Sequence, residues 1–231
     1  EGTKLDAYTT YIVKVVDQNV TVAPKSDVPS FEKKLKDSND TEGTLSDWQD
    51  AADWDMGDDV PFKLEGTVAS NYASYKTYYF AFHDVEERGL TFNKDSVKAY
   101  VDDTEITGGY SVVTEGLADG CTFEVKFADL KQISAVKAGS KIRVEYTSKL
   151  NENAVIGEQG NVNKAKLQYS NNPNDEQGGE NGPTGETPWD NVIVFTYKTV
   201  INKVDDKNQP LKGAEFTLSK KMKNGTTTTV A

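Results

Sequence analysis

Short runs in which apolar and polar residues alternate recur along most of the chain. A period of two is typical of β-strands that bury one face, and turn-forming residues separate the runs. Two segments have weak helical spacing instead, residues 45–54 with Ser46 as the N-cap and residues 128–136. The pattern predicts an all-β protein made of immunoglobulin-like β-sandwich domains in tandem. The predicted strands are two runs within 8–24, then 31–36, 60–68, 75–85, 91–93, 97–101, 123–127, 141–150, 163–169, 192–197 and 200–204.

The predicted strands divide the chain into three parts. Residues 26–198 form one nearly complete sandwich, residues 1–25 are the end of a preceding domain or a linker, and residues 199–231 begin a second sandwich. The chain opens within a strand-like run and stops in TTTTVA, so we expect it to be a piece of a longer protein. A length of 231 residues is sufficient for this organisation.

Composition narrows the range of partners. The net charge of -11 disfavours nucleic acid as a partner. No apolar run approaches the roughly 20 residues that span a bilayer, so membrane insertion is not expected. The single cysteine, Cys121, excludes an intrachain disulfide, and we interpret it as an unreactive thiol.

Neither a metal centre nor a cofactor site is expected. The acidic stretch from Asp50 to Asp59 lacks the ligand spacing of a calcium loop. Alternation places His83, the single histidine, at the surface. No Ser/His/Asp set, phosphate-binding loop or CxxC pair is present, so enzymatic turnover is not expected.

Lys33 occupies an unusual position in its predicted strand. Phe31, Lys33 and Leu35 share one strand face, and the two apolar residues should point into a core and carry Lys33 with them. A lysine in an apolar interior is costly and needs a reason. The alternative is an ordinary edge lysine, with Lys34 facing inward in its place.

An asparagine and an aspartate are also predicted to face the core. Asn163 begins the face that carries Ala165, Leu167 and Tyr169, although Asn161, Asn171 and Asn172 are further candidates. Asp84 follows Tyr78, Phe80 and Phe82 in period two, although it could instead start the turn at residues 86–89. Burial lowers the pKa of a lysine and raises that of an aspartate, which would give a neutral amine beside a protonated carboxyl.

Three stretches resemble the backbone (major) pilins of Gram-positive bacteria, surface proteins polymerised by class C sortases. VTVAPK at 20–25 is similar to the pilin motif, although Ala23 replaces the usual aromatic residue and the upstream tryptophan is missing. The opening of a Cna B-type domain resembles INKVDDKNQPLKGAEFTL at 201–218. The isopeptide-forming domain of fimbrial subunits resembles DVPF at 59–62, YKTYYFAFHDVEERGLTF at 75–92 and KLNENAVIGEQGNVNKAKLQYSNNP at 149–173.

The resemblance implies a structural subunit of an extracellular, cell-wall-anchored pilus. It implies that Lys25 is the amine that sortase joins to the next subunit, and that Lys33 bonds to Asn163 with loss of ammonia, assisted once per molecule by Asp84. Lys203 resembles the crosslinking lysine of the second domain, whose partner would lie beyond Ala231. The implied partners are other pilin subunits in a head-to-tail polymer, the sortase and host surface ligands.

Two other functions compete with this one. The same domains occur in adhesins at a pilus tip or on the cell wall, which bind a host ligand and do not need an acceptor lysine; Lys25 would then be an exposed linker residue. A carbohydrate-active enzyme of β fold would require paired carboxylates about 5–10 Å apart in a cleft.

Overall fold

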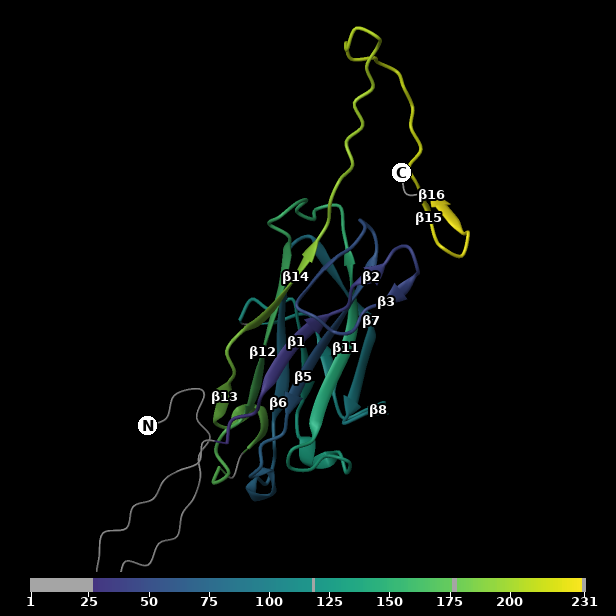
Figure 1. The fold of residues 1–231 in the computed structure, drawn as a ribbon. Helices are drawn as coiled ribbons and strands as arrows, with labels where there is room; N and C mark the ends of the chain where they lie inside the picture. Colours follow the sequence, from purple (N-terminus) through teal and green to yellow (C-terminus); the bar gives the residue numbers. More distant parts are fainter. Residues whose placement is uncertain (1–26, 118, 176–177, 230–231) are drawn as a thin grey trace, which may run out of the picture.

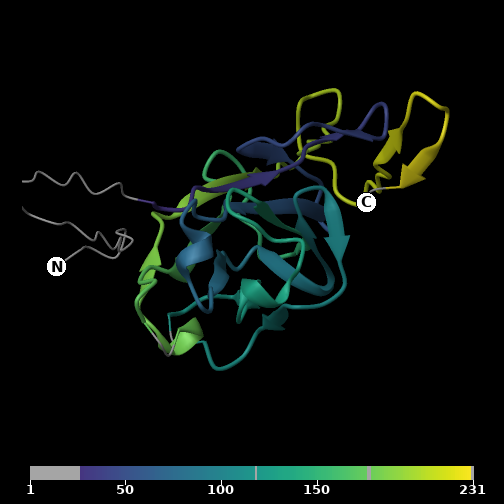
Figure 2. The same cartoon turned by 90° about the horizontal axis from the view of Figure 1, so that it is seen from below.

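Two β-sheets packed face to face make up most of the structure (Figures 1 and 2). This computed structural model describes residues 27–117, 119–175 and 178–229. The predicted all-β sandwich is confirmed. No helix within these ranges is long and apolar enough to cross a membrane.

The first sheet has five strands and is antiparallel throughout. Its strands are, in spatial order, β1 (Phe31–Leu35), β5 (Asp59–Thr67), β11 (Lys141–Leu150), β7 (Leu90–Val101) and β8 (Thr104–Ile106).

The second sheet has seven strands, and its only parallel pair among the described strands is β4 with β14. Its strands are, in spatial order, β4 (Ala51–Asp53), β14 (Asp190–Phe195), β12 (Asn161–Ser170), β6 (Phe80–Glu86), β10 (Phe123–Phe127) and β9 (Ser111–Val113), with β13 (Thr184–Glu186) paired to β12.

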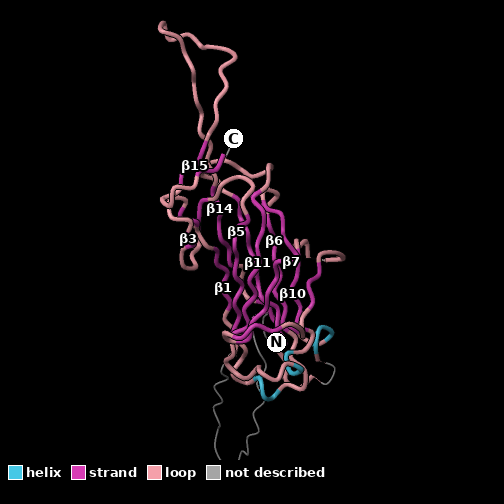
Figure 3. Tube along the Cα trace, turned by 90° about the vertical axis from the view of Figure 1, so that its right-hand side faces the viewer, coloured by secondary structure: helices cyan, strands magenta, loops and turns pink. Residues whose placement is uncertain are grey.

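Short elements decorate the two ends of the sandwich. Three 3-10 helices lie at one end (Figure 3), and two small hairpins lie toward the other. The helices are η1 (Tyr72–Ser74), η2 (Leu130–Gln132) and η3 (Gly179–Asn181). The hairpins are β2 (Ser38–Asn39) with β3 (Thr44–Leu45), and β15 (Ser219–Lys221) with β16 (Thr227–Thr229).

Aromatic side chains fill the space between the sheets. Phe80 and Phe82 of β6 pack edge to face with ring centroids 5.5 Å apart, and Phe62 of β5 stacks on Tyr146 of β11 at 5.3 Å. Alternate residues of β11 are buried, as its sequence pattern predicts. Removal of this apolar surface from water is the main force that holds the two sheets together.

Most predicted strands are confirmed, and the helical segments are corrected. Residues 123–127 and 141–150 have the predicted bounds, whereas 91–93 and 97–101 belong to one strand, β7. The helix over 45–54 is wrong, because residues 51–53 pair with β14 and bury Ala52 at the sheet edge. Of the segment 128–136, one 3-10 turn forms, and Asp129 caps it by accepting a hydrogen bond from the Lys131 amide.

The strand predicted at 200–204 is also wrong. Val204 forms only an isolated bridge with Pro210, and Ile201 is 54% exposed. A strand needs a neighbour for its backbone groups, and this segment extends beyond the sandwich (Figure 1). The chain then comes back to the hairpin of β2 and β3, where the Lys223 amide donates a hydrogen bond to the Thr41 carbonyl at 2.7 Å. The domain boundary near residue 199 stays a prediction.

His83 is not at the surface, contrary to its predicted position. It does point away from the space between the sheets, because its neighbour Asp84 points into that space, but only 7% of it is exposed. The loop before β10 covers the imidazole, and Asp119 lies 2.8 Å from its Nδ1. Burial and Asp119 raise the pKa of the Cys121 thiol.

Gly66 of β5 faces Phe80 and Leu167 of the second sheet, which makes its replacement informative. A Cβ at Gly66 would lie 2.8 Å from Phe80 Cζ and 3.0 Å from Leu167 Cδ2. Gly66→Ala should therefore reduce the free energy of unfolding by about 1–3 kcal/mol in denaturant titrations. Gly108→Ala, with no atom within 4 Å of its Cβ, is the matched control and should stay within about 0.5 kcal/mol of wild type. Equal stability of the two variants would contradict this account of the packing.

Candidate functional site

Lys33 of β1 is fully buried between the two sheets. Its amide donates to Asp190 Oδ2 at 2.8 Å, which fixes this edge strand against β14. The neighbouring Lys34 points outward and pairs with Asp50 at 2.5 Å. The strand therefore directs Lys33, and not Lys34, into the core.

Asp84 reaches the Lys33 amine from the opposite sheet. It is fully buried on β6, and its Oδ2 accepts hydrogen bonds from Lys33 Nζ at 2.5 Å and from the Tyr146 hydroxyl at 2.8 Å. Aromatic rings surround the amine, since the ring centroids of Phe62 and Tyr146 each lie 5.3 Å from Nζ. The pair is shielded from water by residues of both sheets.

Asn163 completes the cluster from β12. It is fully buried, and its Nδ2 donates to the Tyr146 hydroxyl at 3.0 Å and to Glu86 Oε1 at 3.3 Å. Lys33 Nζ donates to the same hydroxyl at 2.7 Å. Tyr146 thus holds the lysine amine and the asparagine amide next to each other.

Burial dominates the electrostatics of this cluster. Loss of hydration lowers the pKa of Lys33, although Asp84 and Glu86 oppose the shift. The same cause raises the pKa of Asp84, against the opposing effect of Lys33. Both shifts favour transfer of a proton from the amine to the carboxyl, which leaves a neutral amine beside a protonated acid.

Three oxygens of the cluster are buried without a hydrogen-bond partner among the described residues. They are Oδ1 of Asp84, Oε2 of Glu86 and Oδ1 of Asn163. An unpaired buried acceptor costs about 1–3 kcal/mol. A proton on Asp84 Oδ1 would turn one of these acceptors into a donor and so remove part of this cost.

Sequence reasoning missed two members of the cluster, Tyr146 and Glu86. Glu86 shares a strand face with Asp84 on β6, and Tyr146 lies on the buried face of the alternating run that the sequence predicts over 141–150. Glu86 lies two residues after Asp84, so extension of the period-two pattern by one more step would have found it. Burial, with the Asp84 charge, raises the pKa of Glu86 to about 8.

The remaining candidates lie apart from this cluster. Asn161 is buried, but its side chain bonds to the backbone of Val155 and Val194, a structural role. Lys203 is exposed in the segment beyond the sandwich. Lys25 lies outside the described residues.

Comparisons with known proteins agree with the predicted resemblance. The Trypsin-resistant surface T6 protein of Streptococcus pyogenes serotype M6 is 31% identical over 209 residues, which are 85% of this chain and 37% of that protein. The chain therefore spans well under half of the length of this curated relative. No family model matches the chain.

Solved structures extend the comparison to the fold. The T6 backbone pilin of serotype M6 Streptococcus pyogenes superposes with a TM-score of 0.54 at 26% identity, over 81% of this chain and 40% of that one. The 35 kDa C-terminal fragment of the major pilin GBS80 of Streptococcus agalactiae gives a TM-score of 0.58 at 19% identity, over 80% and 61% of the two chains. The resemblance to backbone pilins of Gram-positive bacteria is confirmed.

The raised pKa of Glu86 predicts how stability depends on pH. The unfolded chain releases this proton near its ordinary pKa of 4.5, whereas the folded chain keeps it up to a pKa of about 8. Between these values the folded state binds more protons, so the free energy of unfolding should fall as pH rises. Glu86→Gln should reduce this slope in denaturant titrations across the pH range, and Glu115→Gln, at an exposed loop position, should not. The same slope in wild type and Glu86→Gln would contradict the assignment.

Proposed function

We propose that this chain, a relative of the backbone pilins, is part of the structural subunit of an extracellular, cell-wall-anchored pilus and crosslinks itself through Lys33 and Asn163. The observation that carries the proposal is the buried contact of Lys33, Asp84 and Asn163 around the Tyr146 hydroxyl. An amine, an acid and an amide enclosed together by apolar walls suit a single amide exchange better than repeated turnover of a substrate.

The crosslinking reaction follows from the positions of these groups. Asp84 takes a proton from the Lys33 amine, and the neutral Nζ attacks Cγ of Asn163. The protonated Asp84 polarises the amide carbonyl and returns the proton to the departing nitrogen. The Cγ–Nδ2 bond breaks and ammonia leaves, Asp84 takes the extra proton from Nζ, and a neutral Lys33–Asn163 amide remains.

The new bond would join the two sheets covalently. Lys33 lies on the edge strand of the first sheet, and Asn163 lies on an inner strand of the second. By the chain-entropy estimate used for disulfides, closure of this loop of about 130 residues contributes about 5 kcal/mol. Reductants do not cleave an amide, so the link would persist where a disulfide could fail.

Polymerisation would use a different lysine. Lys25 follows Pro24 and precedes Ser26 and Asp27, a setting typical of an exposed turn. Its amine would accept the C-terminal acyl group of the next subunit from a class C sortase, which gives a head-to-tail chain of pilin subunits. Lys203 is the proposed crosslinking lysine of the following domain.

An adhesin that binds a host surface ligand is the second candidate function. The related surface protein and backbone pilin favour the structural subunit instead. The two functions differ in their need for Lys25, because a tip adhesin does not have to accept a further subunit.

The crosslink predicts an intact mass below that of the sequence by one ammonia. Asp84→Asn should restore the full mass, since the amide cannot act as an acid, and the free energy of unfolding should fall by up to about 5 kcal/mol. Asp95→Asn, at an exposed position on β7, is the matched control and should keep the lower mass.

Fragment spectra should place Lys33 and Asn163 in one branched peptide, and Asn163→Ala should abolish that peptide. Full sequence mass in the wild-type chain would overturn the crosslink. A lower mass that survives Asn163→Ala would assign the bond to another pair.

Lys25 can be tested on cells that display the full-length protein. Lys25→Arg keeps the charge but removes the primary amine, so high-molecular-weight ladders should disappear from the cell surface while the monomer keeps its melting temperature. Lys36→Arg is the control and should leave the ladders intact. Ladders that persist in Lys25→Arg would move the acceptor to another lysine or favour the adhesin.

A further inference from the structure

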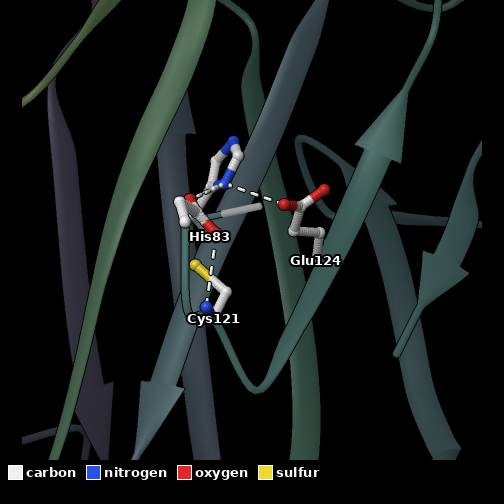
Figure 4. A group of neighbouring side chains, drawn as sticks. His83, Cys121 and Glu124 are labelled. Atoms are coloured by element: carbon white, nitrogen blue, oxygen red, sulfur yellow. Dashed lines mark hydrogen bonds and ion pairs between the residues drawn. The ribbon is translucent and has the colours of Figure 1, made fainter. Parts of the chain in front are cut away.

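Four side chains with metal-binding atoms converge on the outer face of the second sheet (Figure 4). His83 comes from β6, Glu124 from β10, and Asp119 and Cys121 from the loop that precedes β10. Their ligand atoms all lie within 4.8 Å of one another. This group faces away from the Lys33 cluster, because His83 and Asp84 are adjacent residues on opposite faces of β6.

Hydrogen bonds fix which nitrogen of His83 faces the group. Gln168 Nε2 donates to Thr184 Oγ1 at 2.9 Å, so Gln168 Oε1 is the atom that lies 3.0 Å from His83 Nε2. That oxygen accepts, so Nε2 is the nitrogen that donates to Gln168. Nδ1 is therefore the nitrogen that points toward the two carboxylates.

Two carboxylate oxygens lie close to the same ring nitrogen of His83. Asp119 Oδ2 lies 2.8 Å and Glu124 Oε1 lies 3.2 Å from Nδ1. Two anionic oxygens this close to one nitrogen favour a positive charge between them, which a proton on Nδ1 or a metal ion would supply. A proton on Nδ1 can form a good hydrogen bond to only one of the two oxygens. A metal ion could instead coordinate Nδ1, both oxygens and the Cys121 thiolate together.

Burial and access both suit a bound ion. The side chains of His83 and Glu124 are only 9% and 6% exposed, and Glu124 Oε2 lies 3.0 Å from Lys126 Nζ, which orients the carboxylate. A cavity of about 410 Å³, lined in part by Tyr79, Leu117 and Glu186, opens beside the group. An ion could thus reach the group from solvent through this cavity and exchange most of its bound water for protein ligands.

We propose that His83, Asp119, Cys121 and Glu124 bind one Zn²⁺ ion. One imidazole, one thiolate and two carboxylates form the mixed donor set that zinc accepts in tetrahedral geometry, whereas Ca²⁺ takes oxygen ligands only. Tetrahedral zinc places its ligand atoms roughly 3.5 Å apart, so the two carboxylate oxygens would separate slightly from Nδ1 while the most distant ligand atoms of the group, which lie within 4.8 Å, would approach one another. The Cys121 thiol gives its proton to solvent as the sulfur–zinc bond forms.

The hydrogen bond from His83 Nε2 to Gln168 supplies the outer support that such sites require. Metal-binding histidines usually donate their second N–H to an oxygen acceptor, which sets the tautomer and the ring orientation. Occupancy would attach the loop that ends at Cys121 to strands β6 and β10. The ion would therefore act as a clamp on the outer face of the sheet, independent of the crosslink between the sheets.

Titration of the purified 231-residue chain with Zn²⁺ and with Co²⁺ tests the proposal. We expect one ion per chain, a melting temperature raised by Zn²⁺, and a thiolate-to-cobalt charge-transfer band that excess Ca²⁺ does not remove. Cys121→Ser, in a partly exposed loop, should abolish the band and weaken binding at least about tenfold, and Gln168→Leu should weaken it by about 10–100-fold.

Glu115→Gln, in the same loop but outside the group, is the matched control and should bind as wild type does. Circular dichroism confirms that each variant folds. The proposal is overturned if no stoichiometric binding occurs, if wild type lacks the charge-transfer band, or if Cys121→Ser and Gln168→Leu both bind with unchanged affinity.

Discussion

The cost of burying an amine is the constraint on which the rest of this structure depends. Lys33 has no exposed surface, and its ammonium form loses its hydration in an aromatic core. Asp84 offsets that loss only in part, because the carboxylate is buried as well. A neutral pair, followed by the proposed amide, would remove both charges from the core. The residues that seem destabilising at first are therefore those that the proposed crosslinking chemistry requires.

The edge strand β1 carries the amine of the site, whereas inner strands of both sheets fix the position of that amine. β1 has five residues and a single sheet neighbour, so its backbone hydrogen bonds alone attach it only weakly to the sandwich. Asp190 binds its backbone, and Lys33 inserts between the sheets. Tyr146 and Asp84, on inner strands of opposite sheets, then define where the amine lies. Precision at the site thus comes from the rigid centre of the sandwich.

Local alternation predicted much of the fold, and together with the resemblance to pilins it singled out the main residues of the site. It gave the bounds of β10 and β11, and it placed Lys33, Asp84 and Asn163 on inward faces because one residue's direction fixes those of its neighbours in a strand. It failed where a distant contact decides the outcome. Residues 51–53 form a strand only because β14 lies beside them, and His83 is buried only because a loop folds over it. Neither contact leaves a periodic signal in the nearby sequence.

The position of the proposed bond determines how tension would pass through the subunit. A pull applied at Lys25 enters the described fold at β1, whose separation from β5 would otherwise break one backbone hydrogen bond after another. With Lys33 joined to Asn163, the load leaves β1 through an amide and enters β12. There Asn163 lies in register with Val192 of β14, the strand that leads out of the sandwich toward the following segment. The chain between the two bonded residues is thereby removed from the path of the force, so the strands that form most of the core can remain folded while the fibre is under load.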